Sequence, residues 1–220
     1  MGYNVGNERS RSQRAEQLRR IGDLTGARKA LAVAAEINHD HVCGFIEICR
    51  QRSIDYVVAP YEADAQIAYL MKNGYTDIVI SEDSDLLAYK CQTVLFKLQL
   101  SGACQVIKLE KALDHLSLTH EGFLNMCIAA GCEYLPNVRG IGIHSAKKLV
   151  TEGSNFLAVL QRNKYAPGEH TIGFQTVKAI FLHQTVINPA DGTTIPLSPW
   201  EETPDLHSQT SCGMYPLKYI

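Results

Sequence analysis

The sequence of 220 residues lacks a membrane-length apolar run, a leader of basic then apolar residues, an internal repeat and a low-complexity tract. These absences exclude an integral membrane protein, and we expect no membrane partner. The seven cysteines include no C-x-x-C pair, which favours free thiols in a reduced compartment over a disulfide framework or a zinc knuckle. Apolar residues make up 45% and charged residues 20%, the composition of a globular chain with one substantial core.

A basic excess is also absent, because 21 lysine and arginine residues face 23 acids and give a formal net charge of −2. The basic residues are nevertheless concentrated near the N-terminus, where seven of them lie between residues 8 and 29 against three acids. A basic arm coupled to an acidic cleft fits an enzyme that holds a polyanion at one place and cuts it at another. A solvated helix face without a partner explains the charge equally well.

Two pairs of carboxylates carry the main functional signal. Each pair directly follows a short apolar run that predicts a strand, with Glu62 and Asp64 in one case and Asp83 and Asp85 in the other. Strands separated by a helix form a βαβ unit, and their carboxyl ends meet at a common crevice. Four acids there repel one another unless a cation neutralises them, and oxygen ligands suit Mg²⁺. The pattern predicts a metal-assisted phosphoester site.

The same acids have a simpler explanation, since carboxylates in the first turn of a helix commonly cap it and complement its dipole. Either pair alone fits capping as well as it fits metal binding. Two pairs at equivalent positions of successive strand–helix junctions favour the metal site.

The spacing of apolar residues divides the chain into helical and mixed segments. We expect helices over residues 13–52 and a βαβ region over residues 55–108. Thr119 is placed to cap a further helix that Gly131 would end. Beyond residue 188, proline, serine and threonine increase, and we expect order to decline. The predicted strands cover residues 56–60, 77–80, 93–96 and 105–107.

A glycine-containing turn precedes another predicted helix. Gly140 and Gly142 flank Ile141 directly after Arg139, and Lys148 follows within the helix. Glycines at this position let backbone N–H groups approach a phosphate, and the helix N-terminus adds a favourable dipole. A G-x-G pattern on its own is a weak signal and is usually a tight turn.

Four motifs therefore follow one another along the chain, at residues 58–66, 82–87, 131–135 and 139–142. In this order they resemble the structure-specific 5′ nucleases, the flap endonuclease and xeroderma pigmentosum G superfamily. Residues 182–189 and 195–197 resemble its exonuclease 1 branch more than the flap endonucleases. The resemblance runs from about residue 8 to about residue 200.

The resemblance implies an α/β fold, with an incomplete parallel-sheet, PIN-like 5′ nuclease core, a helical arch segment and a helix-two-turn-helix DNA-binding element. Arg9, Arg11 and Arg14 fall in or near the arch. The implied regions are a basic arch remnant at 1–52, an internal nuclease region at 53–135, the DNA-binding region at 136–187 and a partly disordered C-terminal extension at 188–220.

The resemblance also implies two Mg²⁺ ions per site in the complete protein. Glu62 and Asp64 would serve the first ion, partly through water, and Asp83 and Asp85 the second, with Glu133 as a further ligand. All but Glu133 would be catalytic. A K⁺ ion held by backbone carbonyls is implied at the DNA-binding element. The residues implied there are Arg139, Gly140, Ile141, Gly142 and Lys148.

By resemblance we expect a Mg²⁺-dependent 5′→3′ double-stranded DNA exonuclease with flap endonuclease activity in nuclear DNA repair. Its partners would be DNA with a 5′ end or flap and mismatch-repair proteins, and we expect a monomer. The nuclear location is inherited from the resemblance alone.

Two departures from the family pattern bear on this expectation. In the family, a segment with two strands, two aspartates and a lysine precedes the arch, whereas residues 1–4 lead here almost directly into it. Glu133 stands where the family has aspartate, and a misplacement near 1 Å can lower a rate about a hundredfold. We therefore expect a partial gene model or a truncated isoform. The alternatives are a catalytically inert DNA-binding module and a scaffold whose acids are only caps.

Overall fold

The computed structural model describes residues 5–34, 37, 39–152 and 170–213. The chain divides into two compact units, Met1–Val57 and Val58–Ile220. The predicted divisions after residues 135 and 187 stay predictions. No helix in the described part of the chain is long and apolar enough to cross a membrane.

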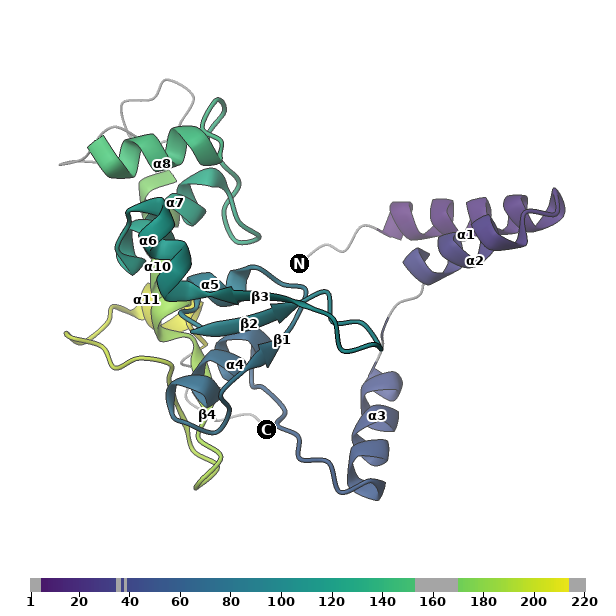
Figure 1. Cartoon of the computed structure of the whole chain (residues 1–220), viewed down its shortest axis with the longest axis horizontal. Coiled ribbons are helices and arrows are strands. Elements are labelled where there is room, and N and C mark those ends of the chain that lie inside the picture. Colours follow the sequence, from purple (N-terminus) through teal and green to yellow (C-terminus); the bar gives the residue numbers. More distant parts are fainter. Residues whose placement is uncertain (1–4, 35–36, 38, 153–169, 214–220) are drawn as a thin grey trace. The chain divides into compact units, whose positions relative to one another are not determined.

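Helices make up the described part of the first unit, as predicted for residues 13–52. They are α1 (Val5–Arg20), α2 (Leu24–Ala34) and α3 (His39–Gln51). Helices α1 and α2 form a hairpin (Figure 1), in which Ala15 and Ala27 are buried and their small side chains allow close approach. Asp23 caps α2, because its Oδ1 accepts a hydrogen bond from Gly26 N at 2.8 Å.

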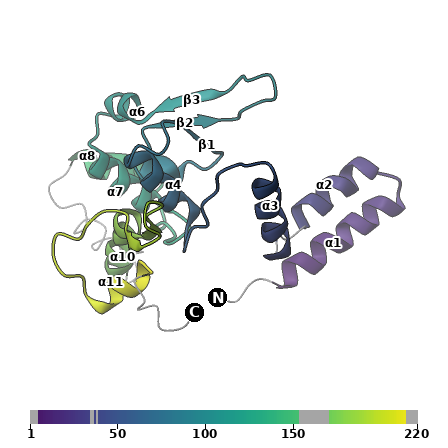
Figure 2. The ribbon, with the colours of Figure 1, turned by 90° about the horizontal axis from the view of Figure 1, so that it is seen from below.

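The second unit is a mixed α/β structure, and the loop between β2 and β3 projects from it (Figure 2). Its strands are β1 (Val79–Ile80), β2 (Thr93–Phe96), β3 (Gln105–Lys108), β4 (Thr185–Ile187) and β5 (Thr194–Pro196). Its described helices are α4 (Ala63–Lys72), α5 (Asp85–Ala88), α6 (Leu109–Leu116), α7 (His120–Ala130), α8 (Ile143–Glu152), α10 (His170–His183) and α11 (Leu206–Ser211).

Two small sheets organise the described part of this unit. Strand β1 pairs in parallel with β2, placing Val79 opposite Val94, and β2 pairs in antiparallel fashion with β3. Strands β4 and β5 form a separate antiparallel pair, with Val186 opposite Ile195. The expected parallel sheet is therefore present only as the β1–β2 pair, and the larger sheet is mixed.

Residues 56–60 do not form the predicted strand, so α4 follows an irregular segment and the expected βαβ unit is incomplete. A strand needs a neighbour to take its backbone hydrogen bonds. Among the described residues β1 pairs only with β2, and Val58 is exposed. Within the first unit, Arg50 contacts Tyr56 instead, and its Nε donates to the phenol oxygen at 2.9 Å.

Residues 188–213 differ from the expectation of declining order, because β5 and α11 lie within them. Leu197 N donates to Gln184 O and Thr185 N donates to Cys212 O, each at 2.9 Å. Asp205 caps α11 through a 2.7 Å hydrogen bond from Ser208 N. The polar residues here serve as caps and links between elements.

Two helix predictions near the DNA-binding region are confirmed. Thr119 Oγ1 accepts from Gly122 N at 3.1 Å and caps α7, which ends before Gly131. The helix expected after Gly142 is α8. Residues 153–169, between α8 and α10, lie outside the described residues, so the helix-two-turn-helix element stays a prediction.

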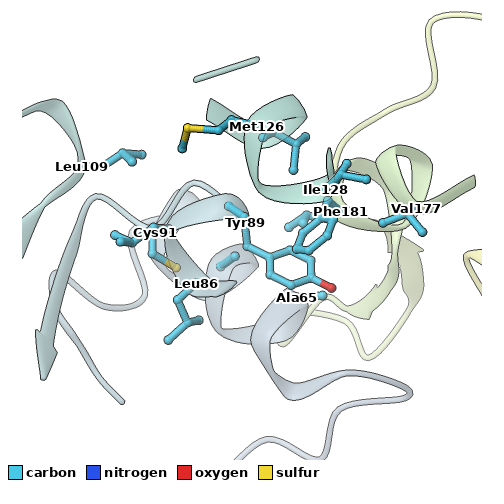
Figure 3. Packing of buried hydrophobic residues seen from close by; sticks show 14 of the residues in the cluster. Ala65, Leu86, Tyr89, Cys91, Leu109, Met126, Ile128, Val177 and Phe181 are labelled. Carbon is cyan, nitrogen blue, oxygen red and sulfur yellow. The ribbon is translucent and has the colours of Figure 1, made fainter. Parts of the chain in front are cut away.

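The core of the second unit joins both sheets through helices (Figure 3). The side chains of Leu86 in α5, Leu124 and Ile128 in α7, Val94 in β2 and Val186 in β4 are fully buried. Helix α10 adds further apolar residues, among them Phe174, Val177 and Phe181. Segments up to 132 positions apart in the sequence, from Ala65 to Leu197, therefore share one apolar cluster, and that cluster includes residues of the carboxylate-bearing elements α4 and α5.

We expect Leu124→Ala to lower the free energy of unfolding by about 2–5 kcal/mol, because it leaves a cavity at a fully buried position of α7. Urea denaturation followed by circular dichroism measures the change. The matched control is Leu100→Ala in the exposed β2–β3 loop, where the cost should be below about 0.5 kcal/mol. Equal losses for the two variants would contradict the proposed core.

Candidate metal centre

The first carboxylate pair lies at the start of α4. Glu62 is the N-cap residue with an extended backbone, but its side chain makes no capping hydrogen bond. Asp64 lies in the first turn and is partly buried, and its neighbour Ala65 is fully buried. Capping therefore does not explain the presence of Glu62.

The second pair lies at the junction of β1 and α5, with Asp83 just before α5 and Asp85 as its first residue. Asp83 Oδ1 accepts a hydrogen bond from Asp85 N at 2.9 Å, and Ser81 Oγ accepts one from Asp83 N at 3.0 Å. A side-chain turn typical of aspartate thus engages one oxygen of Asp83, while Ser84, the N-cap residue of α5, makes no side-chain capping hydrogen bond. Leu86 is fully buried and anchors the four-residue helix α5, which leaves Asp85 partly buried at its first position.

A tight turn after α7 presents Glu133. Cys132 and Leu135 exchange two backbone hydrogen bonds across it, of 3.0 and 3.3 Å. Gly131 has a φ of 102°, and a Cβ at this position would lie 2.9 Å from Asn137 N. Only glycine fits there without a shift of the backbone. The exposed Glu133 side chain therefore depends on a turn that needs a residue without a Cβ.

The five predicted metal ligands influence one another electrostatically. The pKa of Asp64 is raised from 3.8 to about 6, first by burial and then by the negative charges of Asp83, Asp85, Glu133 and Glu62, in that order of size. The pKa of Asp85 is raised by burial and then by Asp83 and Glu133. The structure thus brings acids from three separate segments into one negative field, while their assignment as metal ligands stays a prediction.

The donor chemistry of this cluster fits a hard divalent cation. No three histidine, cysteine, aspartate or glutamate side chains in the described part of the chain are arranged to hold a metal directly. Mg²⁺ usually keeps several waters and is bound by only one or two carboxylates, so it does not require such a group. The oxygen donors and the raised pKa of Asp64 fit an ion bound largely through water.

The predicted DNA-binding residues lie in the turn before α8 and in α8 itself. Ile141 is buried and its N–H donates to Val138 O at 2.9 Å, while Gly140 between them has a φ of 87°. Asn137 Nδ2 donates to Ile141 O at 2.9 Å, so this carbonyl is already engaged. A Cβ at Gly140 or Gly142 would meet no atom within 4 Å, which shows that the turn faces open space.

The two basic residues predicted there, Arg139 and Lys148, are both exposed. Lys148 Nζ lies 3.6 Å from Glu152 Oε1, in an ion pair whose side chains are 72% and 64% exposed. Such a pair contributes little to stability and leaves the ammonium accessible.

The predicted arch residues lie on α1, in the first unit. Arg14 is exposed, whereas the side chains of Arg9 and Arg11 lie outside the described residues. Arg20 on the same helix pairs with Glu16 at 3.5 Å. Solvated charge accounts for the described part of this face, so an arch role stays a prediction.

Sequence reasoning missed a tyrosine pair beneath the acidic cluster. The hydroxyl oxygens of Tyr89 and Tyr134 lie 3.3 Å apart, and both rings pack against Phe181, with centroid distances of 4.7 and 5.8 Å. Figure 3 shows Tyr89 beside Phe181. Burial raises the pKa of both tyrosines and keeps them neutral. The pair joins residues 45 positions apart, and no local pattern indicates that separation.

Comparison with known proteins agrees with the order of these motifs. Residues 53–133 match the family described as XPG I-region. Exonuclease 1 of Xenopus laevis is 36% identical over 203 residues, which cover 86% of this chain and 27% of that protein. The chain therefore spans about a quarter of the length of this curated relative.

Solved structures show the same relationship. The flap endonuclease-1 from Methanococcus jannaschii superposes with a TM-score of 0.58 and 28% identity, over 72% of this chain and 49% of that one. The catalytic core of Rad2 in complex with DNA substrate has a TM-score of 0.53 and 21% identity, over 74% and 49%, and supports the fold alone. With its XPG I-region and its similarity to exonuclease 1, the chain belongs to the structure-specific 5′ nuclease superfamily.

Proposed function

We propose that this chain supplies the acidic metal site and part of the DNA-binding surface of a Mg²⁺-dependent 5′→3′ DNA exonuclease with flap endonuclease activity. The observation that carries the proposal is the convergence of five carboxylates from three segments, where burial and then the charges of the other four acids raise the pKa of Asp64. The similarity to exonuclease 1 supports the direction of cleavage and the substrate.

Divalent cations bound at these carboxylates would supply a water of lowered pKa and would neutralise charge that develops on the phosphate. Asp64 and Asp85 would have to ionise for this, although their burial favours the neutral form. The hydrogen bond from Asp85 N restrains the Asp83 carboxylate. Glu62 extends from the start of α4 without a capping bond of its own.

The turn before α8 would hold the DNA backbone away from the acids. The N-terminus of α8 offers N–H groups and a partial positive charge to a phosphate. The open space around Gly140 and Gly142 leaves room for such an approach. A K⁺ ion at this turn would use carbonyls other than that of Ile141, which accepts from Asn137.

The same similarity extends the proposal to partners and location. We propose duplex DNA with a 5′ end or flap as the substrate, mismatch-repair proteins as partners, a monomeric state and a nuclear location. The Rad2 catalytic core is itself in complex with a DNA substrate.

Asp85→Asn should lower Mg²⁺-dependent cleavage of a 5′-recessed duplex by about a hundredfold or more, because it removes a charged oxygen ligand at the site. Glu82→Gln is the matched control. Glu82 Oε1 accepts from Lys97 N at 2.7 Å, away from the field of Asp64, and glutamine keeps that acceptor. Near-normal turnover in Asp85→Asn would refute the metal assignment. An unchanged chain that binds the duplex without cleaving it would favour the inert DNA-binding module.

The raised pKa of Asp64 predicts a pH dependence of stability without divalent ions. Asp64 holds its proton up to about pH 6 in the folded chain, but only to about pH 4 when unfolded. The folded state then binds more protons between these values, so stability falls as pH rises through this window. As pH rises through this window, the melting temperature of Asp64→Asn should fall less than that of the unchanged chain. Some fall should remain because Asp85 still contributes. Added Mg²⁺ should restore the melting temperature of the unchanged chain above pH 6. Identical profiles of melting temperature against pH for the two chains would contradict the assignment of the raised pKa to Asp64.

Lys148→Gln should weaken duplex binding and reduce the slope of log affinity against log salt by about 1, because one phosphate contact is lost. Fluorescence anisotropy over a salt series measures both quantities. Lys111→Gln, at an exposed position on α6, serves as the control and should leave the slope unchanged. Equal slopes for the two variants would remove Lys148 from the interface.

A further inference from the structure

Gln66 is a buried polar residue beside the acidic cluster. It lies on α4 two residues after Asp64, and only 3% of its surface is exposed. Its side-chain amide makes two hydrogen bonds with the backbone of Ile187, which lies 121 residues later in β4. Nε2 donates to Ile187 O at 2.8 Å, and Ile187 N donates to Oε1 at 2.7 Å.

This contact gives β4 a side-chain substitute for a neighbouring strand. β4 pairs with β5 along one edge. Two further backbone N–H groups of β4 have partners outside the hairpin: Thr185 N donates to Cys212 O, and Ile187 N donates to Oε1 of the Gln66 amide. An amide carries the same donor and acceptor as a peptide group, so Gln66 satisfies both backbone groups of Ile187 at once. Burial without these bonds would be costly for either partner.

The geometry of a helix links this bond to the acidic cluster. Successive residues turn by about 100°, so Gln66 and Asp64 point about 200° apart, on opposite sides of α4. Fixing Gln66 against β4 therefore fixes the rotation of the first turn of α4. That rotation decides where the Asp64 carboxylate points relative to Asp83 and Asp85, whose charges raise its pKa.

A second tether joins α4 to the same part of the chain at its other end. Lys72 Nζ donates to Ser198 Oγ at 2.9 Å and to Leu197 O at 3.3 Å, just after β5. Lys72 lies eight residues beyond Asp64, about 12 Å along the helix axis. The two tethers connect the same pair of segments, but only the Gln66 tether lies beside a carboxylate.

We infer that Gln66 is a positioning residue for Asp64, and that the β4–β5 hairpin thereby helps to set the geometry of the acidic metal site. The inference rests on the proposed function. It assigns to Gln66 no contact with metal or DNA. Its contribution is to hold the first turn of α4 in the one rotation that keeps Asp64 facing the other acids.

The test compares Gln66→Met with Lys72→Met in this chain. Methionine matches the length of glutamine, is one atom shorter than lysine, and in both variants removes the hydrogen bonds to the hairpin or the residues just after it. The readouts are the dissociation constant for Mn²⁺ by isothermal titration calorimetry and the melting temperature by circular dichroism. We expect Gln66→Met to weaken Mn²⁺ binding about tenfold or more, as is typical when a supporting hydrogen bond behind a ligand is lost. Lys72→Met should stay within about twofold of the unchanged chain at a comparable loss of melting temperature.

Gln66→Glu provides the second variant should Gln66→Met fail to fold. Glutamate keeps the acceptor for Ile187 N and loses the donor to Ile187 O. Its extra negative charge would by itself attract a cation, so weaker Mn²⁺ binding in this variant supports the positioning role. Unchanged or tighter binding overturns it.

The outcomes separate the two proposals. If the unchanged chain binds Mn²⁺ and Gln66→Met binds it equally well, the positioning role is overturned and the proposed nuclease site still stands. Equal weakening in Gln66→Met and Lys72→Met also overturns it, because general loss of stability then explains the effect. If the unchanged chain binds Mn²⁺ no better than Asp64→Asn does, the proposed function fails together with the inference built on it.

Discussion

Mutual repulsion among carboxylates is the constraint on which the second unit depends. The acids lie at the start of α4, at the junction of β1 and α5, and in the turn after α7, and their charges add to burial in raising the pKa of Asp64 to about 6. Each of these segments would relax away from the others if it were free to move. Buried residues on their far sides, such as Leu86 in α5 and Ile128 in α7, join them to one apolar cluster. The hydrophobic effect thus stabilises an arrangement that electrostatics alone would disperse.

Local chemistry made several elements predictable. The Thr119 hydroxyl caps α7, and Gly131, which has no side chain, ends it with a positive φ. Both features were predictable because capping involves residues within one turn of each other. The strands at residues 93–96 and 105–108 follow from short runs of apolar and β-branched residues, with one residue added to the second. The acidic residues of the site were likewise found from their position after short apolar runs, although the first of these runs is no strand.

Features that depend on distant partners could not be predicted in this way. Residues 56–60 have the composition of a strand, but among the described residues no strand pairs with them. The contact of Tyr89 with Tyr134 and that of Gln66 with Ile187 join residues 45 and 121 positions apart. Strand β5 was missed because the proline, serine and threonine content beyond residue 188 suggested declining order, whereas β5 pairs with β4, and β4 is held by hydrogen bonds with Gln66 of α4 and with Cys212.

The separation between Gln66 and Ile187 has a consequence for how the protein matures during synthesis. A ribosome adds about 5–20 residues per second, so the 121 residues between them take roughly 6–24 s to appear. Throughout that interval the newly made α4 lacks the partner for its buried amide. A nascent chain can therefore acquire a correctly oriented acidic helix only late in translation, after the hairpin has left the exit tunnel.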